Sequence, residues 1–145
     1  MKKIVSSLVI GGFLFQSNVL ANEVTGLNVI INSGNVQTQM MAMVLSGATL
    51  STHKKQVNIT LCSDAGNLAL KEYKSADLKK ADGTTINPKN ALMGLMKGGA
   101  KVSVCPLFLP NVAKDATALI DGISVAKPPV VAGDLVNPAY SNISF

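Results

Sequence analysis

Three short apolar runs, separated by helix signals, constrain the fold of this chain more than any other feature. The runs are Leu27–Asn32, Gln56–Leu61 and Ala100–Val104, and a shorter fourth run covers Ile123–Ala126. Short runs of this kind, rich in β-branched residues and bounded by turn residues, are typical of buried strands. Strands that alternate with helices indicate an α/β protein with a mostly parallel sheet.

The segments between the runs carry helix signals. Asn35 is a suitable N-cap for a helix over about residues 36–52, where apolar side chains recur at helical spacing. Asn87 followed by Pro88 predicts the start of a second helix, which ends at the glycines after Lys97. We expect a third helix from Asn111 to about residue 120, a last helical turn at 130–136, and an edge strand near 141–145.

We predict a single domain over residues 22–145 with a three-layer flavodoxin-like architecture. Right-handed crossovers leave few arrangements of four parallel strands, and the strand order 2-1-3-4 with an added edge strand fits this pattern best. In that order the first strand lies between the second and the third. The turns that follow the second and third strands then lie at the same edge of the sheet.

The first 21 residues have the three regions of a secretory signal peptide. A basic start, Met1-Lys2-Lys3, precedes a mostly apolar run, and Val19-Leu20-Ala21 offers small residues for cleavage. The apolar run is shorter than the roughly 20 residues that span a bilayer. We therefore expect a periplasmic protein that is cleaved after Ala21 and keeps no stable membrane anchor.

The charge pattern excludes one large class of partner. Without Lys2 and Lys3, 11 of the 13 lysines remain against 8 acidic residues, so the net charge is +3. The chain has no arginine, which is the residue best suited to grip phosphates and guanine edges. Aromatic residues are also scarce. We expect no nucleic-acid partner.

Cys62 and Cys105 are the two cysteines, and each directly follows a predicted strand. In an exported protein a pair of cysteines is often a structural disulfide. The strand order 2-1-3-4, however, places the two strands on either side of a third, so the Cα atoms would be about 9.6 Å apart. A disulfide usually needs less than about 7 Å. We therefore expect Cys105 to be a free thiol at the end of a strand, where open α/β sheets place their chemistry. A nucleophilic role, a transient redox pair with Cys62 and a purely packing role are the alternatives.

A nucleophilic cysteine needs its thiolate, which a nearby lysine or helix N-terminus would favour. Lys114 and the helix predicted to open near Asn111 are candidates for that support. Asp64 either lines the cleft around the thiols or caps the turn after the second strand. Asn35 belongs to a loop that is a candidate wall of the same cleft.

The remaining residues predict no cofactor and no metal site. One histidine and two separated cysteines are too few for a zinc site. Met40, Met41 and Met43 are expected to fill the space between helix and sheet, and copper ligation is the alternative.

The chain resembles the DsrE/DsrF-like family. Four stretches carry the resemblance in order: 27–32 entering a long helix, 57–66 ending in Asp-Ala-Gly, 95–106 with helix, Gly-Gly, strand and Cys-Pro, and 119–125. The Cys-Pro pair after Lys-Val-Ser-Val is the sharpest match.

The resemblance implies a homo-oligomer, a trimer or a hexamer, and a persulfide carried on Cys105 between a sulfur-donor and a sulfur-acceptor protein. The relay members of the family are cytoplasmic, and some have a second nearby cysteine in the helix after the active one. This chain departs from them in its signal peptide and in lacking that cysteine. A donor and an acceptor different from those of the cytoplasmic relays are therefore implied.

Overall fold

The computed structural model describes residues 23–145, so the predicted signal peptide at 1–21 lies outside the described residues. Within residues 23–145, no helix combines the length and the apolar character needed to cross a bilayer.

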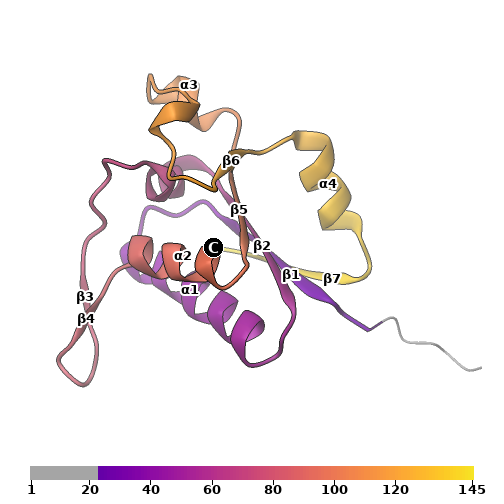
Figure 1. Cartoon of the computed structure of the whole chain (residues 1–145), viewed down its shortest axis with the longest axis horizontal. Helices are drawn as coiled ribbons and strands as arrows, with labels where there is room; N and C mark the ends of the chain where they lie inside the picture. Colours follow the sequence, from indigo (N-terminus) through magenta and orange to yellow (C-terminus); the bar gives the residue numbers. More distant parts are fainter. Residues whose placement is uncertain (1–22) are drawn as a thin grey trace, which may run out of the picture.

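A five-stranded parallel sheet forms the centre of the molecule (Figure 1). Its strands, in the spatial order β6-β5-β2-β1-β7, are β6 (Ser124–Val125), β5 (Lys101–Val104), β2 (Gln56–Leu61), β1 (Gly26–Ile31) and β7 (Tyr140–Ser144). A separate two-stranded antiparallel hairpin pairs β3 (Leu78–Lys79) with β4 (Thr85–Ile86). The predicted edge strand at the C-terminus is therefore confirmed, and it lies beside β1.

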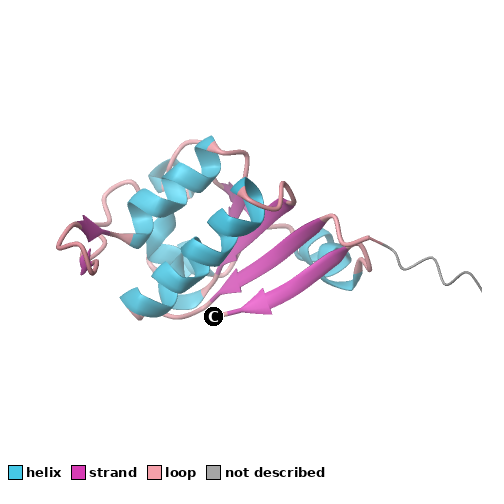
Figure 2. Ribbon diagram, turned by 90° about the horizontal axis from the view of Figure 1, so that it is seen from below, coloured by secondary structure: helices cyan, strands magenta, loops and turns pink. Residues whose placement is uncertain are grey.

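Helices cover both faces of this sheet, which confirms the three-layer α/β arrangement. The helices α1 (Val36–Ser51) and α2 (Pro88–Lys97) pack together on one face, whereas α4 (Pro128–Val136) lies on the other (Figures 1 and 2). Both predicted N-caps are present. The Asn35 Oδ1 atom accepts hydrogen bonds from the N–H groups of Gln37 and Thr38, and the Asn87 Oδ1 atom accepts one from Asn90.

The expected strand order 2-1-3-4 is wrong. The second strand, β2, pairs with both β1 and β5, so it lies between the first and third strands. The order 2-1-3 requires the first two crossover helices to lie on opposite faces of the sheet. Here α1 and α2 share one face, and right-handed crossovers on one face carry the chain across the sheet in a single direction. The chain returns over the other face through α4 and adds β7 outside β1.

A polar face on the sheet explains this arrangement. Side chains alternate along the strands, so Val57, Ile59 and Leu61 are buried under α1 and α2 while Asn58 and Thr60 point to the other face. Asn28 lies in register with Asn58 and Asn142. Its Nδ2 atom donates to the Asn142 side chain at 2.9 Å, and its Oδ1 atom accepts from Asn58 at 3.0 Å. Amide and hydroxyl side chains on this face do not offer the apolar surface against which α1 and α2 would have to pack.

The third predicted helix, over 111–120, is also wrong. The structure forms instead a short helix α3 (Phe108–Asn111) and a separate 3₁₀ turn η2 (Ala116–Ala118). Between them Ala113 has a left-handed backbone with φ of 51°, which a continuous α-helix excludes. Asp115 then caps the 3₁₀ turn by accepting a hydrogen bond from the Thr117 N–H at 2.8 Å.

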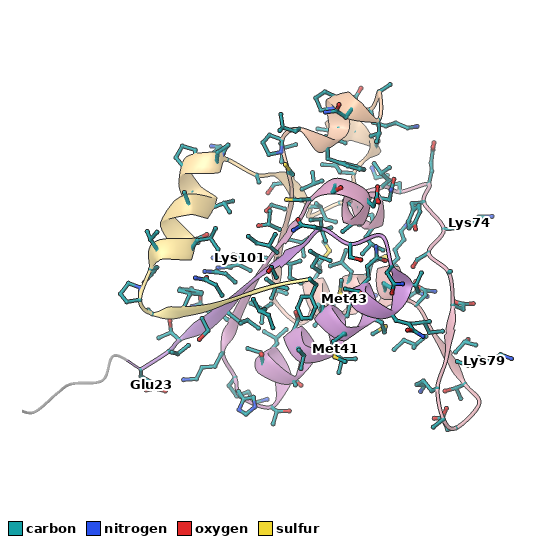
Figure 3. The ribbon with its side chains drawn as sticks, turned by 180° about the vertical axis from the view of Figure 1, so that it is seen from behind. Glu23, Met41, Met43, Lys74, Lys79 and Lys101 are labelled. Carbon is teal, nitrogen blue, oxygen red and sulfur yellow. The ribbon has the colours of Figure 1, made fainter. Side chains whose placement is uncertain are left out.

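The methionine cluster divides between core and surface. Met40 and Met43 are buried between α1 and the sheet, as expected, but Met41 is 53% exposed on the outer side of the helix (Figure 3). Lys74 and Lys79 project into solvent from the segment between η1 (Ser63–Ala69) and α2. Most residues of 72–83 in that segment are exposed to solvent.

Candidate functional site

The two thiols lie side by side at the carboxyl edge of the sheet. The last register pair of β2 and β5 is Leu61 with Val104, so the next residues along both parallel strands are Cys62 and Cys105. Backbone hydrogen bonds hold both in place. The Cys105 N–H donates to the Leu61 carbonyl at 2.8 Å, and the Cys62 N–H donates to the Ile31 carbonyl at 2.8 Å.

This placement overturns the expected separation of the cysteines. Because β2 and β5 are direct neighbours, in-register Cα atoms are about 4.8 Å apart instead of about 9.6 Å. Both residues alternate with the buried pair Leu61 and Val104, so both side chains belong to the face opposite α1 and α2. Both are half-buried and both are free thiols.

Burial and the neighbouring thiol oppose the ionisation of Cys62. Burial raises the pKa of the Cys62 thiol from 9.0 to about 11, and the neighbouring Cys105 adds to this through its negative charge and through a hydrogen bond between the side chains. Cys62 therefore keeps its proton at neutral pH. A protonated thiol is a weaker nucleophile than its own thiolate.

An open groove of about 410 Å³ gives access to Cys105. The 3₁₀ segment η1 forms one wall and the turn through α3 forms the other. The groove is lined by Ser63, Asp64, Asn67, Cys105, Leu107, Phe108, Asn111 and Val112. Leu107 is 70% exposed at this rim, while Phe108 and Leu109 next to it are buried. In the sequence, only the apolar run 107–109 after Cys105 hints at this rim. The structure buries two residues of that run and exposes the first.

The chain reverses sharply after Cys62. Ser63 has a left-handed backbone with φ of 49°, which turns the chain out of β2 and into η1. Asp64, the next residue, is exposed and lies against the loop that follows β1. A Cβ atom added at Gly34 would lie 2.9 Å from the Asp64 Cβ, so this approach depends on the glycine. Gln39 anchors the same loop, because its amide donates to the Ser33 carbonyl at 2.9 Å.

Two contacts that the sequence did not predict hold η1 and the chain just beyond it in place. Gly66 in η1 lies directly against the Phe108 ring. Lys89 on α2 donates from its Nζ atom to the carbonyls of Leu70, Lys71 and Tyr73 at 2.7, 2.8 and 2.6 Å, and so holds the chain just beyond η1. Gly66 ends the Asp-Ala-Gly stretch, but no local sequence pattern indicates either contact, and only the fold makes them.

The structure brings together some of the predicted site residues and not others. Cys62 is adjacent to Cys105, and Asp64 lines the Cys105 groove. Lys114 instead forms an ion pair with Glu72, with 3.3 Å between Nζ and Oε2, and lines a different hollow. Asn35 caps α1 and is not among the residues that line the groove. Among residues 23–145, no lysine or histidine lines the Cys105 groove.

No cluster of three or more potential metal-ligating side chains occurs among residues 23–145. The groove combines the Cys105 thiol with the polar side chains of Asp64, Asn67 and Asn111.

Comparisons with known proteins identify the fold. No family model matches the sequence, and a search of curated proteins finds no significant match. Among solved structures, the YchN protein from E. coli is similar over 83% of this chain and 99% of its own, with a TM-score of 0.66 and 17% identity. MTH1491 from Methanobacterium thermoautotrophicum, described as a protein of unknown function, is similar over 82% of this chain and 99% of its own, with a TM-score of 0.59 and 12% identity. At these identities the likeness establishes the fold: residues 23–145 form the three-layer, mostly parallel α/β sandwich that these two proteins share.

Proposed function

We propose that the mature chain is an exported protein that accepts sulfane sulfur on Cys105 and passes it on. The observation that carries this proposal is the position of the Cys105 thiol, half-buried on one wall of an open groove at the carboxyl edge of a parallel sheet. This edge is where open α/β sheets bind their ligands. The resemblance of the Cys-Pro stretch to the DsrE/DsrF-like family supports the same residue.

The loading step is a nucleophilic displacement. The Cys105 thiolate attacks the sulfane sulfur of a donor such as thiosulfate, the bond between the two sulfur atoms of the donor breaks, and sulfite leaves with the electron pair. Cys105 then carries a persulfide, and no oxidant is consumed. Cys62, which keeps its proton, does not compete for the donor at neutral pH.

The rim of the groove suits a protein partner. Leu107 exposes an apolar side chain next to the thiol, and the polar side chains of Asp64 and Asn67 lie across from it. A periplasmic donor or acceptor protein with a small apolar contact surface around its own reactive sulfur would fit this rim.

Mass spectrometry tests the proposal. The reduced Cys62→Ser variant, without residues 1–21 and with Cys105 as its remaining cysteine, is incubated with thiosulfate or polysulfide and digested with trypsin. We expect one extra sulfur atom on the Cys105 peptide and none in Cys105→Ser. If Cys105 gains no sulfur under conditions that load a known sulfur carrier, the proposal is wrong.

A second candidate function is dithiol–disulfide exchange between Cys62 and Cys105. The in-register pairing of these residues on neighbouring strands favours it. Free-thiol counts and sulfur loading of Cys62→Ser together separate the two functions. A pure redox protein gains two thiols on reduction but its Cys62→Ser variant takes up no sulfur from polysulfide, whereas a sulfur carrier still loads Cys105 in Cys62→Ser.

We also propose that the chain forms a homo-oligomer, a trimer or a hexamer. Large apolar side chains are exposed on α1 (Met41, Val44 and Leu45) and on α4 (Val130 and Val136). Light scattering on the mature protein measures the assembly. If Cys105→Ser keeps every measured function within such an oligomer, a purely structural or binding role replaces the sulfur chemistry.

A further inference from the structure

Cys62 has no part in the loading step, yet it lies directly beside the thiol that is loaded. We propose that Cys62 is a resolving thiol: it attacks the persulfide on Cys105, releases the outer sulfur as hydrogen sulfide, and closes a Cys62–Cys105 disulfide. This inference rests on the proposed function, because it requires a persulfide on Cys105. It makes the protein a sulfide-releasing reductant of sulfane sulfur as well as a carrier.

The geometry of neighbouring parallel strands suits this bond. In-register residues have Cα atoms about 4.8 Å apart, within the range of about 4.4–6.8 Å that disulfides span. Cys62 and Cys105 occupy such a pair of positions, one step beyond Leu61 and Val104. The backbone at Cys62 is extended, with φ of −125° and ψ of 164°, so it continues the line of β2. No change of strand register is needed to bring the two sulfurs together.

The surroundings keep the two sulfurs close. The Leu61 carbonyl accepts the N–H of Cys105, so one backbone hydrogen bond links the residue before Cys62 to Cys105 itself. Both Leu61 and Val104 are completely buried, which anchors the two strand ends in the core. Because the sulfurs are held together before reaction, the intramolecular step gains the rate advantage of proximity.

The step is balanced without an external oxidant. The Cys62 thiol gives its proton to the outer sulfur of the adjacent Cys105 persulfide as the Cys62 sulfur forms a bond to the inner sulfur, and the bond between the inner and outer sulfurs breaks. The outer sulfur leaves with the electron pair and takes up the proton that Cys62 loses, giving hydrogen sulfide. Cys62 is oxidised from a thiol to a disulfide sulfur, and the outer sulfur is reduced to sulfide. An external dithiol then reduces the disulfide and restores both thiols.

The same arrangement assigns different roles to the two cysteines. Cys62 is shielded by burial and keeps its proton, whereas Cys105 lines the groove through which a donor arrives. Cys105 therefore meets the donor first, and Cys62 meets only the persulfide that has formed beside it. An acceptor protein that arrives before Cys62 reacts takes the outer sulfur instead.

One experiment follows the fate of the loaded sulfur. Reduced wild-type protein, Cys62→Ser and Cys105→Ser are treated briefly with polysulfide, desalted at once, and followed by sulfide assay and intact mass. We expect the wild type to release sulfide at least about tenfold faster than Cys62→Ser, because its resolving thiol is already in place. The wild type should end two hydrogen atoms lighter, with Cys62 and Cys105 peptides linked, while Cys62→Ser keeps one extra sulfur atom.

The outcomes separate the two proposals. If Cys62→Ser takes up no sulfur, the proposed function is wrong and the resolving step falls with it. If Cys62→Ser is loaded but the wild type keeps its extra sulfur equally long, only the resolving step is overturned.

A second arm tests the pairing without any sulfane sulfur. Reduced wild-type protein is oxidised with diamide and mapped under non-reducing conditions, with Cys62→Ser as the control. We expect the Cys62–Cys105 disulfide within one chain. If diamide links chains to each other but never Cys62 to Cys105, the resolving step is overturned while sulfur loading of Cys62→Ser still decides the proposed function.

Discussion

The Phe108 ring lies so close to Gly66 that no side chain fits between them. Phe108 belongs to the turn that follows Cys105, and its N–H donates to the Cys105 carbonyl at 3.0 Å. Gly66 belongs to η1, which follows Cys62. The contact therefore joins the two segments that leave the two cysteines, and it sets the width of the groove between them.

We expect Gly66→Ala to force Phe108 out of its position. Overpacking at such a contact costs about 1–3 kcal/mol of unfolding free energy, and persulfide loading of Cys105 should slow because the groove wall moves. Gly94→Ala is the matched control, since Gly94 lies in α2 with nothing near its added Cβ. That change should stabilise the protein by about 0.5–1 kcal/mol. Urea unfolding measures the free energy of unfolding of both variants. If Gly66→Ala and Gly94→Ala change it equally, the close contact between Gly66 and Phe108 is contradicted.

The ionisation of Cys62 gives a prediction for pH. Because burial and the Cys105 charge raise the folded-state pKa to about 11, alkylation of Cys62 by iodoacetamide should reach half its maximal rate near pH 11 in the wild type. In Cys105→Ser the pH of half-maximal Cys62 alkylation should fall, because the negative charge of Cys105 and its hydrogen bond to Cys62 are gone. It should stay above 9.0, because burial is the largest cause and remains.

The same shift predicts how stability depends on pH. A group whose folded-state pKa is raised holds its proton more tightly when folded, so stability falls as pH rises from about 9 to about 11. Cys62→Ser should remove this part of the fall. Identical slopes for wild type and Cys62→Ser across this window would show that the Cys62 thiol is not shielded.

Lys89 is expected to hold the chain beyond η1. Lys89→Met keeps most of the side-chain length but removes three hydrogen bonds to backbone carbonyls. The expected cost is about 2–4 kcal/mol, because hydrogen bonds from a charged donor are among the stronger ones. Amide exchange within 70–75 should also become faster. Lys97→Met, at an exposed position on the same helix, is the control and should change little.

The asparagine ladder on the second face is expected to anchor α4. The Asn28 Nδ2 atom donates to the Asp134 carbonyl at 2.7 Å as well as to Asn142. Asn28→Ala leaves the Asp134 carbonyl and the Asn58 side-chain amide without their Asn28 partner. The free energy of unfolding should fall by about 1–3 kcal/mol. Hydrogen exchange should rise in 128–136 more than in α1. Unchanged protection of α4 would mean that other contacts hold the helix.

Local signals in the sequence placed most elements correctly. The Asn35 and Asn87 caps define where α1 and α2 begin, and short apolar runs bounded by turn residues define β1, β2 and β5. These features depend on hydrogen bonds and side-chain periods within a few residues, so a linear sequence displays them. The third helix is one exception, because the chain takes a left-handed turn at Ala113, a residue type that rarely adopts this conformation.

The sequence also contained a signal for the strand order. Asn58 and Thr60 alternate with Val57, Ile59 and Leu61, and Ser103 alternates with Val102 and Val104. That pattern indicates one apolar face and one polar face. It therefore argues against strands buried on both sides by apolar helices, which the order 2-1-3-4 assumes.

The sequence by itself determined that Cys62 and Cys105 each end a buried strand of an α/β protein, because apolar runs and turn residues are local properties. Only the tertiary structure decided that these two strands are neighbours. That result depends on which face of the sheet α1 and α2 share, a choice made by packing between segments far apart in the chain. It places two thiols in register that the predicted order kept apart, and so makes chemistry between them possible.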